Sequence, residues 1–144
     1  MGIEIHELEG SRPTQVTRAV WLLWVALILA IVGAVPMYLE PLPSDIVAPK
    51  WSLWALLAFV WGFWALLTFA IGRRQNWARV TTLLFFIGGL IYYLWEPQAL
   101  TARPGYELAL QFADTTMTGI ALYWLFTGSG AAWFRRIQRE SNAL

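Results

Sequence analysis

Long apolar runs alternate with short polar connections along most of this chain. The runs cover residues 17–39, 51–71, 80–95 and 106–126. Each is close to the roughly 20 apolar residues that a transmembrane helix requires. Because the connections are short, successive helices are expected to reverse direction. The pattern predicts an all-α membrane protein, with an antiparallel up-down-up-down four-helix transmembrane bundle over residues 17–127.

Two polar segments flank the predicted bundle. Residues 1–16 are expected to form a cytoplasmic N-terminal tail, and the prolines within 40–50 favour an extended loop between the first two helices. The first apolar run is longer than the roughly 7–15 residues of a signal-peptide core, which favours an uncleaved first span. Residues 128–144 are predicted to form a cytoplasmic amphipathic tail in the headgroup region. Its apolar residues Trp133, Phe134 and Ile137 lie beside Arg135, Arg136 and Arg139.

The fourth apolar run differs from the others because strongly polar residues interrupt it. Glu107, Gln111, Asp114 and Thr118 fall within a band of about 60° on one helix face, a group that we call the polar stripe. A carboxylate near the bilayer centre costs about 2.5–3.5 kcal/mol on insertion scales, so such a face normally turns away from lipid. Asp114 would lie about 12 Å below Tyr106, close to mid-membrane.

Three interpretations of the polar stripe are open. It can line a pathway that passes a proton or holds a small cation, with Asp114 as the titrating group. It can instead provide hydrogen bonds that fix the register of neighbouring helices. It can also form a recognition surface for a partner membrane protein. No catalytic set, cofactor site or metal site is expected at the stripe or elsewhere.

Small residues on three of the runs indicate faces where helices can approach closely. These helix-packing positions are Ala26, Ala30, Gly33, Gly62, Gly88 and Gly89. The second run also carries Trp61 and Trp64 too deep for an interfacial aromatic belt. We expect these two indoles to fill space between helices. A cofactor or pigment pocket is the alternative.

The basic residues predict the orientation in the membrane. Of the ten Lys and Arg residues, only Lys50 and Arg103 fall on one side of the predicted bundle. Arginines are enriched on the cytoplasmic side of membrane proteins, so both termini and the connection after the second helix are expected in the cytoplasm. The other side holds Arg12, Arg18, Arg73, Arg74, Arg79, Arg135, Arg136 and Arg139.

Composition excludes several classes of function. The chain of 144 residues is 58% hydrophobic and 13% charged, and its net charge of +1 gives no reason to expect nucleic acid as a partner. It has no cysteine, which removes thiol redox chemistry and iron–sulfur ligation. The one histidine, His6, precedes the predicted helices, so neither a bis-histidine haem nor an HExxH metalloprotease can be built within the bundle. We therefore expect a protein that is not an enzyme.

Residues 12–24, 72–79 and 133–136 resemble segments of small four-span bacterial inner-membrane proteins of unassigned role. The resemblance covers most of the chain in layout and implies a bacterial inner-membrane location, without an activity or site residues. Small multidrug exporters, which also have four spans, carry an essential carboxylate in their first span. This chain has none there, so no site is transferred from them.

The leading hypothesis is a non-enzymatic integral inner-membrane protein that acts as a structural, accessory or protective partner of other membrane components. The alternative is a small homo-oligomeric channel or proton-coupled transporter that uses the polar stripe. The expected partners are the lipid bilayer and either further copies of the chain or other membrane proteins.

Overall fold

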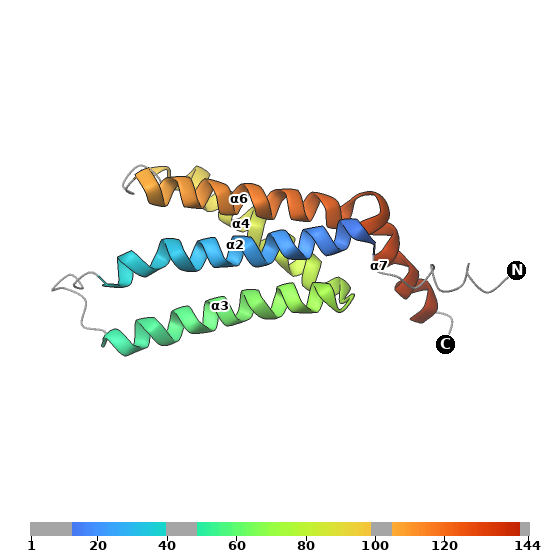
Figure 1. Ribbon diagram of the computed structural model, residues 1–144, viewed down its shortest axis with the longest axis horizontal. Helices are drawn as coiled ribbons and strands as arrows, with labels where there is room; N and C mark the ends of the chain where they lie inside the picture. Colours follow the sequence, from blue (N-terminus) through green and yellow to red (C-terminus); the bar gives the residue numbers. More distant parts are fainter. Residues whose placement is uncertain (1–12, 40–48, 99–104, 142–144) are drawn as a thin grey trace, which may run out of the picture.

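The computed structural model describes residues 13–39, 49–98 and 105–141, and it is all-helical over these ranges, as predicted. The expected N-terminal tail, residues 1–16, lies outside the described residues as far as residue 12, and its last three residues belong to α2. Residues 40–48 of the extended loop expected at 40–50 also lie outside the described residues. Figure 1 shows α2 lying between α3 and α6, with α7 across one end. The helices are α2 (Thr14–Leu39), α3 (Lys50–Gly72), α4 (Asn76–Trp95), α6 (Gly105–Phe126) and α7 (Gly128–Ser141).

Within the described residues, three helices are long and apolar enough to cross a membrane. They are the segments Thr14–Val35, Trp51–Gly72 and Asn76–Trp95, which supports the prediction of a membrane protein. Helix α6 has 22 residues, but its polar side chains lower its mean hydropathy. Length and composition therefore do not identify α6 as a span, and its surroundings have to be considered.

Small residues allow α2 and α6 to lie side by side along much of their length (Figure 1). The Ala26 side chain is only 2% exposed. A Cβ atom placed on Gly33 would meet the Leu110 side chain at 3.6 Å, an ordinary van der Waals distance. Two of the predicted packing residues thus lie where helices approach closely, which maximises dispersion contacts where lipid offers no hydrophobic driving force.

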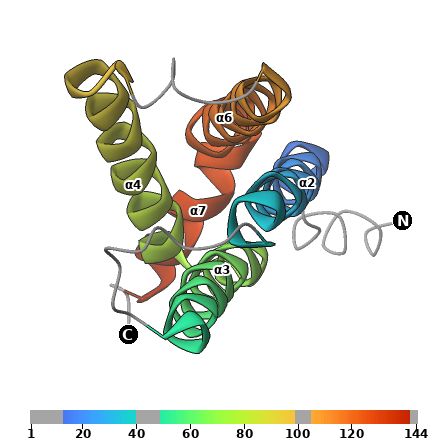
Figure 2. The same cartoon turned by 90° about the vertical axis from the view of Figure 1, so that its left-hand side faces the viewer.

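The buried core gathers at the end of the molecule next to α7. The first turns of α2 and the last turns of α3 and α6 meet there, and α4 begins beside them. Figure 2 shows that α4 leans away from α2 toward its own C-terminal end, where Leu94 is 83% exposed. The helices are therefore packed tightly at one end and separated at the other. The core residues are Val16, Ala19, Val20, Leu23, Leu67, Ala70, Ile71, Ala78, Ala121, Leu125 and Phe134.

Arg79 joins the start of α4 to the end of α6. Helix α4 begins at Asn76, four residues before the predicted start, so Arg79 lies inside its first turn rather than in a connecting loop. Its Nη1 donates to the Leu125 carbonyl oxygen at 3.1 Å, and its Nε donates to Asn76 Oδ1 at 2.6 Å. The bond to Leu125 satisfies a carbonyl that the end of α6 leaves without a helical partner.

Helix α7 is held against this end by aromatic and cationic contacts. Phe134, which we expected in the headgroup region, is 1% exposed because it packs into the core, with the Arg79 guanidinium 4.5 Å from its ring centroid. Arg74 donates from Nε and Nη2 to the Trp133 carbonyl oxygen at 3.3 and 3.1 Å. Its guanidinium also lies 5.0 Å from the Trp133 ring centroid. The second turn of α7, which carries Trp133 and Phe134, is thus part of the folded core.

Glycines make the corner between α6 and α7. Gly128 has φ +54, a left-handed conformation that favours glycine. A Cβ atom on Gly130 would collide with the Trp124 backbone carbonyl oxygen. The corner therefore depends on the absence of a side chain at Gly130.

We predict that Gly130→Ala destabilises the protein by about 1–3 kcal/mol, the usual cost of forcing extra atoms into a packed site. The measurement is thermal unfolding of the purified protein in detergent. Gly88→Ala is the matched control, because a Cβ atom there meets nothing within 4 Å. Equal stability of Gly130→Ala and the parent chain would show that the corner is not packed as described.

Candidate functional site

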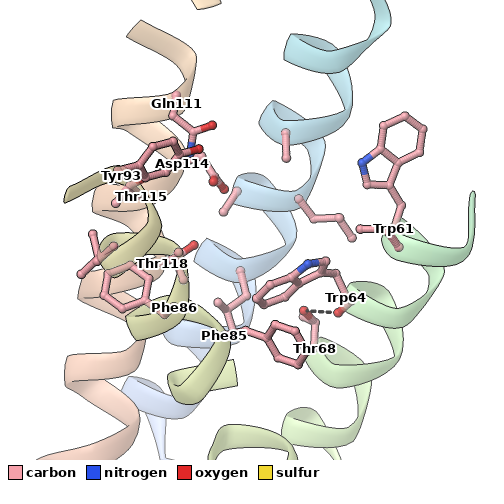
Figure 3. A pocket seen from close by; sticks show the side chains of 17 residues that line it. Trp61, Trp64, Thr68, Phe85, Phe86, Tyr93, Gln111, Asp114, Thr115 and Thr118 are labelled. Atoms are coloured by element: carbon pink, nitrogen blue, oxygen red, sulfur yellow. Dashed lines mark hydrogen bonds between the residues drawn. The ribbon is translucent and has the colours of Figure 1, made fainter. Parts of the chain in front are cut away.

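A cavity of about 280 Å³ lies between α2, α3, α4 and α6, near the middle of the helices and next to the buried core, to which its lining residue Leu23 belongs (Figure 3). Its volume is near the lower end of the roughly 300–1,000 Å³ of small-molecule pockets. The walls of the cavity differ in their side chains: α2 supplies small and aliphatic ones, α3 and α4 aromatic ones, and α6 polar ones. Helix α2 supplies the small and aliphatic side chains Leu23, Ala26, Leu27 and Ala30.

Helix α6 forms the polar wall of the cavity. Gln111, Asp114, Thr115 and Thr118 line it, because spacings of three and four residues bring side chains to one helix face. Gln111 Nε2 donates to Thr115 Oγ1 at 3.2 Å, one turn further along the helix. Three of the four residues of the polar stripe thus meet in one place, joined by Thr115, which the sequence analysis did not single out.

Asp114 is half-buried, and its carboxylate points into the cavity from α6 (Figure 3). No hydrogen bond or ion pair to this carboxylate is present within the described part of the chain. The described cavity walls also hold no lysine, arginine or histidine. A carboxylate removed from bulk water needs a compensating group, so a proton or a bound cation is the partner that this site can accept.

Glu107, the fourth member of the polar stripe, does not line the cavity. It lies in the first turn of α6, and its Oε1 accepts a hydrogen bond from the Tyr106 hydroxyl at 3.1 Å in an exposed position. The helical period places Glu107 on the same face of α6 as Asp114. Because it is two turns away along the axis, it lies beyond the cavity.

Aromatic side chains of α3 and α4 form the wall that faces α6. Trp61 and Trp64 come from α3, and Phe85, Phe86 and Tyr93 come from α4. The Trp64 and Phe85 rings pack edge to face, with centroids 5.9 Å apart and planes at 65°. Thr68 Oγ1 donates to the Trp64 carbonyl oxygen at 3.0 Å, which ties this hydroxyl to its own helix (Figure 3). The two deep tryptophans thus both pack and line a pocket.

The sequence analysis did not single out Phe85 and Phe86, which α4 contributes to the cavity. Phe86, Gly89 and Tyr93 recur at spacings of three and four residues, so they share a helix face. That periodicity was available as a signal. It could not show which helix this face would meet.

The predicted packing residues have different surroundings. Ala30 and Gly89 line the cavity, where small side chains leave its volume open. Gly62 and Gly88 are exposed, and a Cβ atom at either would meet nothing within 4 Å. Neither of these two exposed glycines takes part in close helix packing within the described chain.

The cavity can hold one positive charge. Among the described residues, Asp114 is the only carboxylate that lines it, and no group of three or more His, Cys, Asp or Glu side chains could hold a metal ion. Amide and hydroxyl groups beside Asp114 can accept or donate hydrogen bonds to a bound cation or to water.

Comparisons with known proteins identify no relative. The chain matches no protein-family model, no curated protein and no solved structure. The proposal of a function therefore depends on the geometry of the cavity.

We predict that the cavity contains water, because it is far larger than the roughly 10–15 Å³ that one water needs and has several polar partners. Thiols react with methanethiosulfonates as thiolates, which form only where water is present. Since the chain has no cysteine, Thr115→Cys introduces a single thiol there. In liposomes this variant should react with methyl methanethiosulfonate much faster than Phe112→Cys, whose parent side chain is 58% exposed on the outer face of α6. Equal rates would mean that the cavity is dry.

Proposed function

We propose that α2, α3, α4 and α6 all cross the bacterial inner membrane as an antiparallel bundle, with both termini in the cytoplasm. Support comes from the basic residues, because Arg18, Arg73, Arg74, Arg79 and Arg135 belong to the helix ends that meet at α7. Positive charge at one end of a membrane domain favours the cytoplasmic side for that end.

The surroundings of α6 support its role as the fourth span. Its polar residues Gln111, Asp114 and Thr118 line the cavity, so they need not face lipid. Its outer face exposes Phe112, Ile120 and Tyr123, which suit a hydrocarbon environment. The low mean hydropathy of α6 is therefore compatible with a membrane position.

Within this membrane domain we propose a non-enzymatic role in proton-coupled movement of a small cation. The observation that carries the proposal is the Asp114 carboxylate, which faces a cavity walled by four helices of one chain and has no basic partner in the described walls. Burial makes an uncompensated charge costly. Asp114 would therefore exchange a cation for a proton, which couples the movement of the two.

The position of the polar stripe also supports one of its interpretations over another. A stripe turned toward a cavity inside one chain favours a solute pathway over a surface on which a partner protein docks. A second copy of the chain is not needed to complete the cavity, because α2, α3 and α4 supply its other walls.

A structural or accessory role is the second candidate. Gly62 on α3 and Gly88 on α4 are exposed and without close neighbours. Exposed small residues allow a transmembrane helix of another protein, or of a second copy, to approach closely. On this proposal the two glycines would mark the contact with other membrane components.

Proteoliposomes with an acidic lumen and a trapped pH-sensitive dye test the transport proposal. Added sodium, potassium or choline salts are expected to dissipate the pH gradient faster than in empty liposomes, for at least one of these cations. Asp114→Asn, which keeps the size but removes the charge, should reduce the rate to that of empty liposomes. Glu107→Gln, which alters a carboxylate outside the cavity, should retain the rate.

Two results would contradict transport. One is an absence of flux above that of empty liposomes for every cation. The other is unchanged flux in Asp114→Asn. Co-purification of the protein with a larger complex in a fixed ratio, together with either result, would favour the accessory role.

The orientation has a separate test. A fluorescent reporter that matures only in the cytoplasm, fused after Leu144, is expected to fluoresce in a bacterial host. A reporter enzyme that is active only outside the inner membrane should be inactive at the same position. The opposite pair of signals would invert the proposed topology.

A further inference from the structure

We infer that the cavity accepts a small organic ammonium cation of single charge in preference to an inorganic cation. This inference rests on the proposed function and specifies the substrate class of the same site. It depends on how charge, oxygen atoms and aromatic rings are distributed over the cavity walls.

The charge of the ligand follows from the charge of the described walls. Asp114 supplies one negative charge, and none of the described residues that line the cavity is basic. A ligand with one positive charge leaves the loaded site neutral. A dication would leave a net positive charge in a poorly solvated place, which is costly.

The chemistry of the ligand follows from where the oxygen atoms lie. Gln111, Thr115 and Thr118 add polar groups beside Asp114, but all of these belong to α6. On the facing walls, the Thr68 hydroxyl is bonded to the Trp64 carbonyl oxygen, and the Tyr93 side chain of α4 lies close to Asp114 and Thr115 (Figure 3). Hard inorganic cations prefer oxygen ligands on all sides. Four of the six oxygen-bearing side chains that line this cavity therefore belong to α6, and oxygen ligands do not surround its centre on all sides.

The aromatic wall suits the opposite side of an ammonium ion. Trp61 and Trp64 of α3 and Phe85 of α4 line the cavity across from the carboxylate (Figure 3). Aromatic faces attract cations, tryptophan most strongly, and alkyl groups on nitrogen pack well against such rings. The ammonium nitrogen would therefore lie toward Asp114, with its alkyl groups against the indoles.

The volume limits the size of the ligand. About 280 Å³ accommodates a compact ammonium compound together with some water, and it is smaller than most pockets for drug-sized molecules. Choline is a suitable probe because its neutral isostere, 3,3-dimethylbutan-1-ol, has the same shape without the charge.

Isothermal titration of the purified full chain in nanodiscs tests this inference. Choline should bind at least about tenfold more tightly than 3,3-dimethylbutan-1-ol, and a hundredfold excess of sodium chloride should not displace it. Asp114→Asn and Trp64→Leu should each weaken choline binding by about tenfold. The controls Glu107→Gln and Trp95→Leu lie outside the cavity and should bind choline as the parent chain does. If Trp64→Leu does not fold, Trp61→Leu replaces it.

Equal binding of choline and its neutral isostere would overturn the inference, and so would displacement of choline by a hundredfold excess of sodium chloride. Choline affinity unchanged in both cavity variants would also overturn it. Choline binding without any flux would support this site while removing the transport proposal. Proton-linked flux of sodium or potassium without choline binding would retain transport and overturn the ligand class.

Discussion

The dominant constraint on this structure is the cost of a carboxylate in a segment that also carries an apolar outer face. In the proposed membrane position of α6, Asp114 would face hydrocarbon only at a high cost, so the polar side of α6 turns toward the other helices. Small residues on α2 allow α6 to lie close, with Gly33 near Leu110. This close contact sets the rotation of α6 and points Asp114 into the space between the helices.

The two ends of the molecule differ because different forces act on them. At the α7 end, buried side chains and the guanidinium groups of Arg74 and Arg79 join four helix ends through carbonyl and aromatic contacts. At the other end α4 leans outward (Figure 2), and its exposed apolar side chains suit lipid. The cavity lies between the tightly packed end and the more open end.

The cavity arises from unequal side-chain sizes on its walls. Ala26 and Ala30 on α2 leave space, while Trp64 and Phe85 hold α3 and α4 apart from the polar wall. In protein interiors, interdigitating side chains normally fill such space. Here the polar groups of α6 favour water or a ligand within it, because a filled apolar core would leave Asp114 without a partner.

The sequence by itself determined the helical class, the apolar character of three helices and the grouping of Gln111, Asp114 and Thr118 on one face. These properties depend on composition and on the 3.6-residue period, which are local. Only the tertiary structure decided that Phe85 and Tyr93 face Asp114, that Glu107 lies beyond the cavity and that Phe134 is buried. These outcomes depend on contacts between helices far apart in the chain, and a local period carries no information about the partner of a helix face.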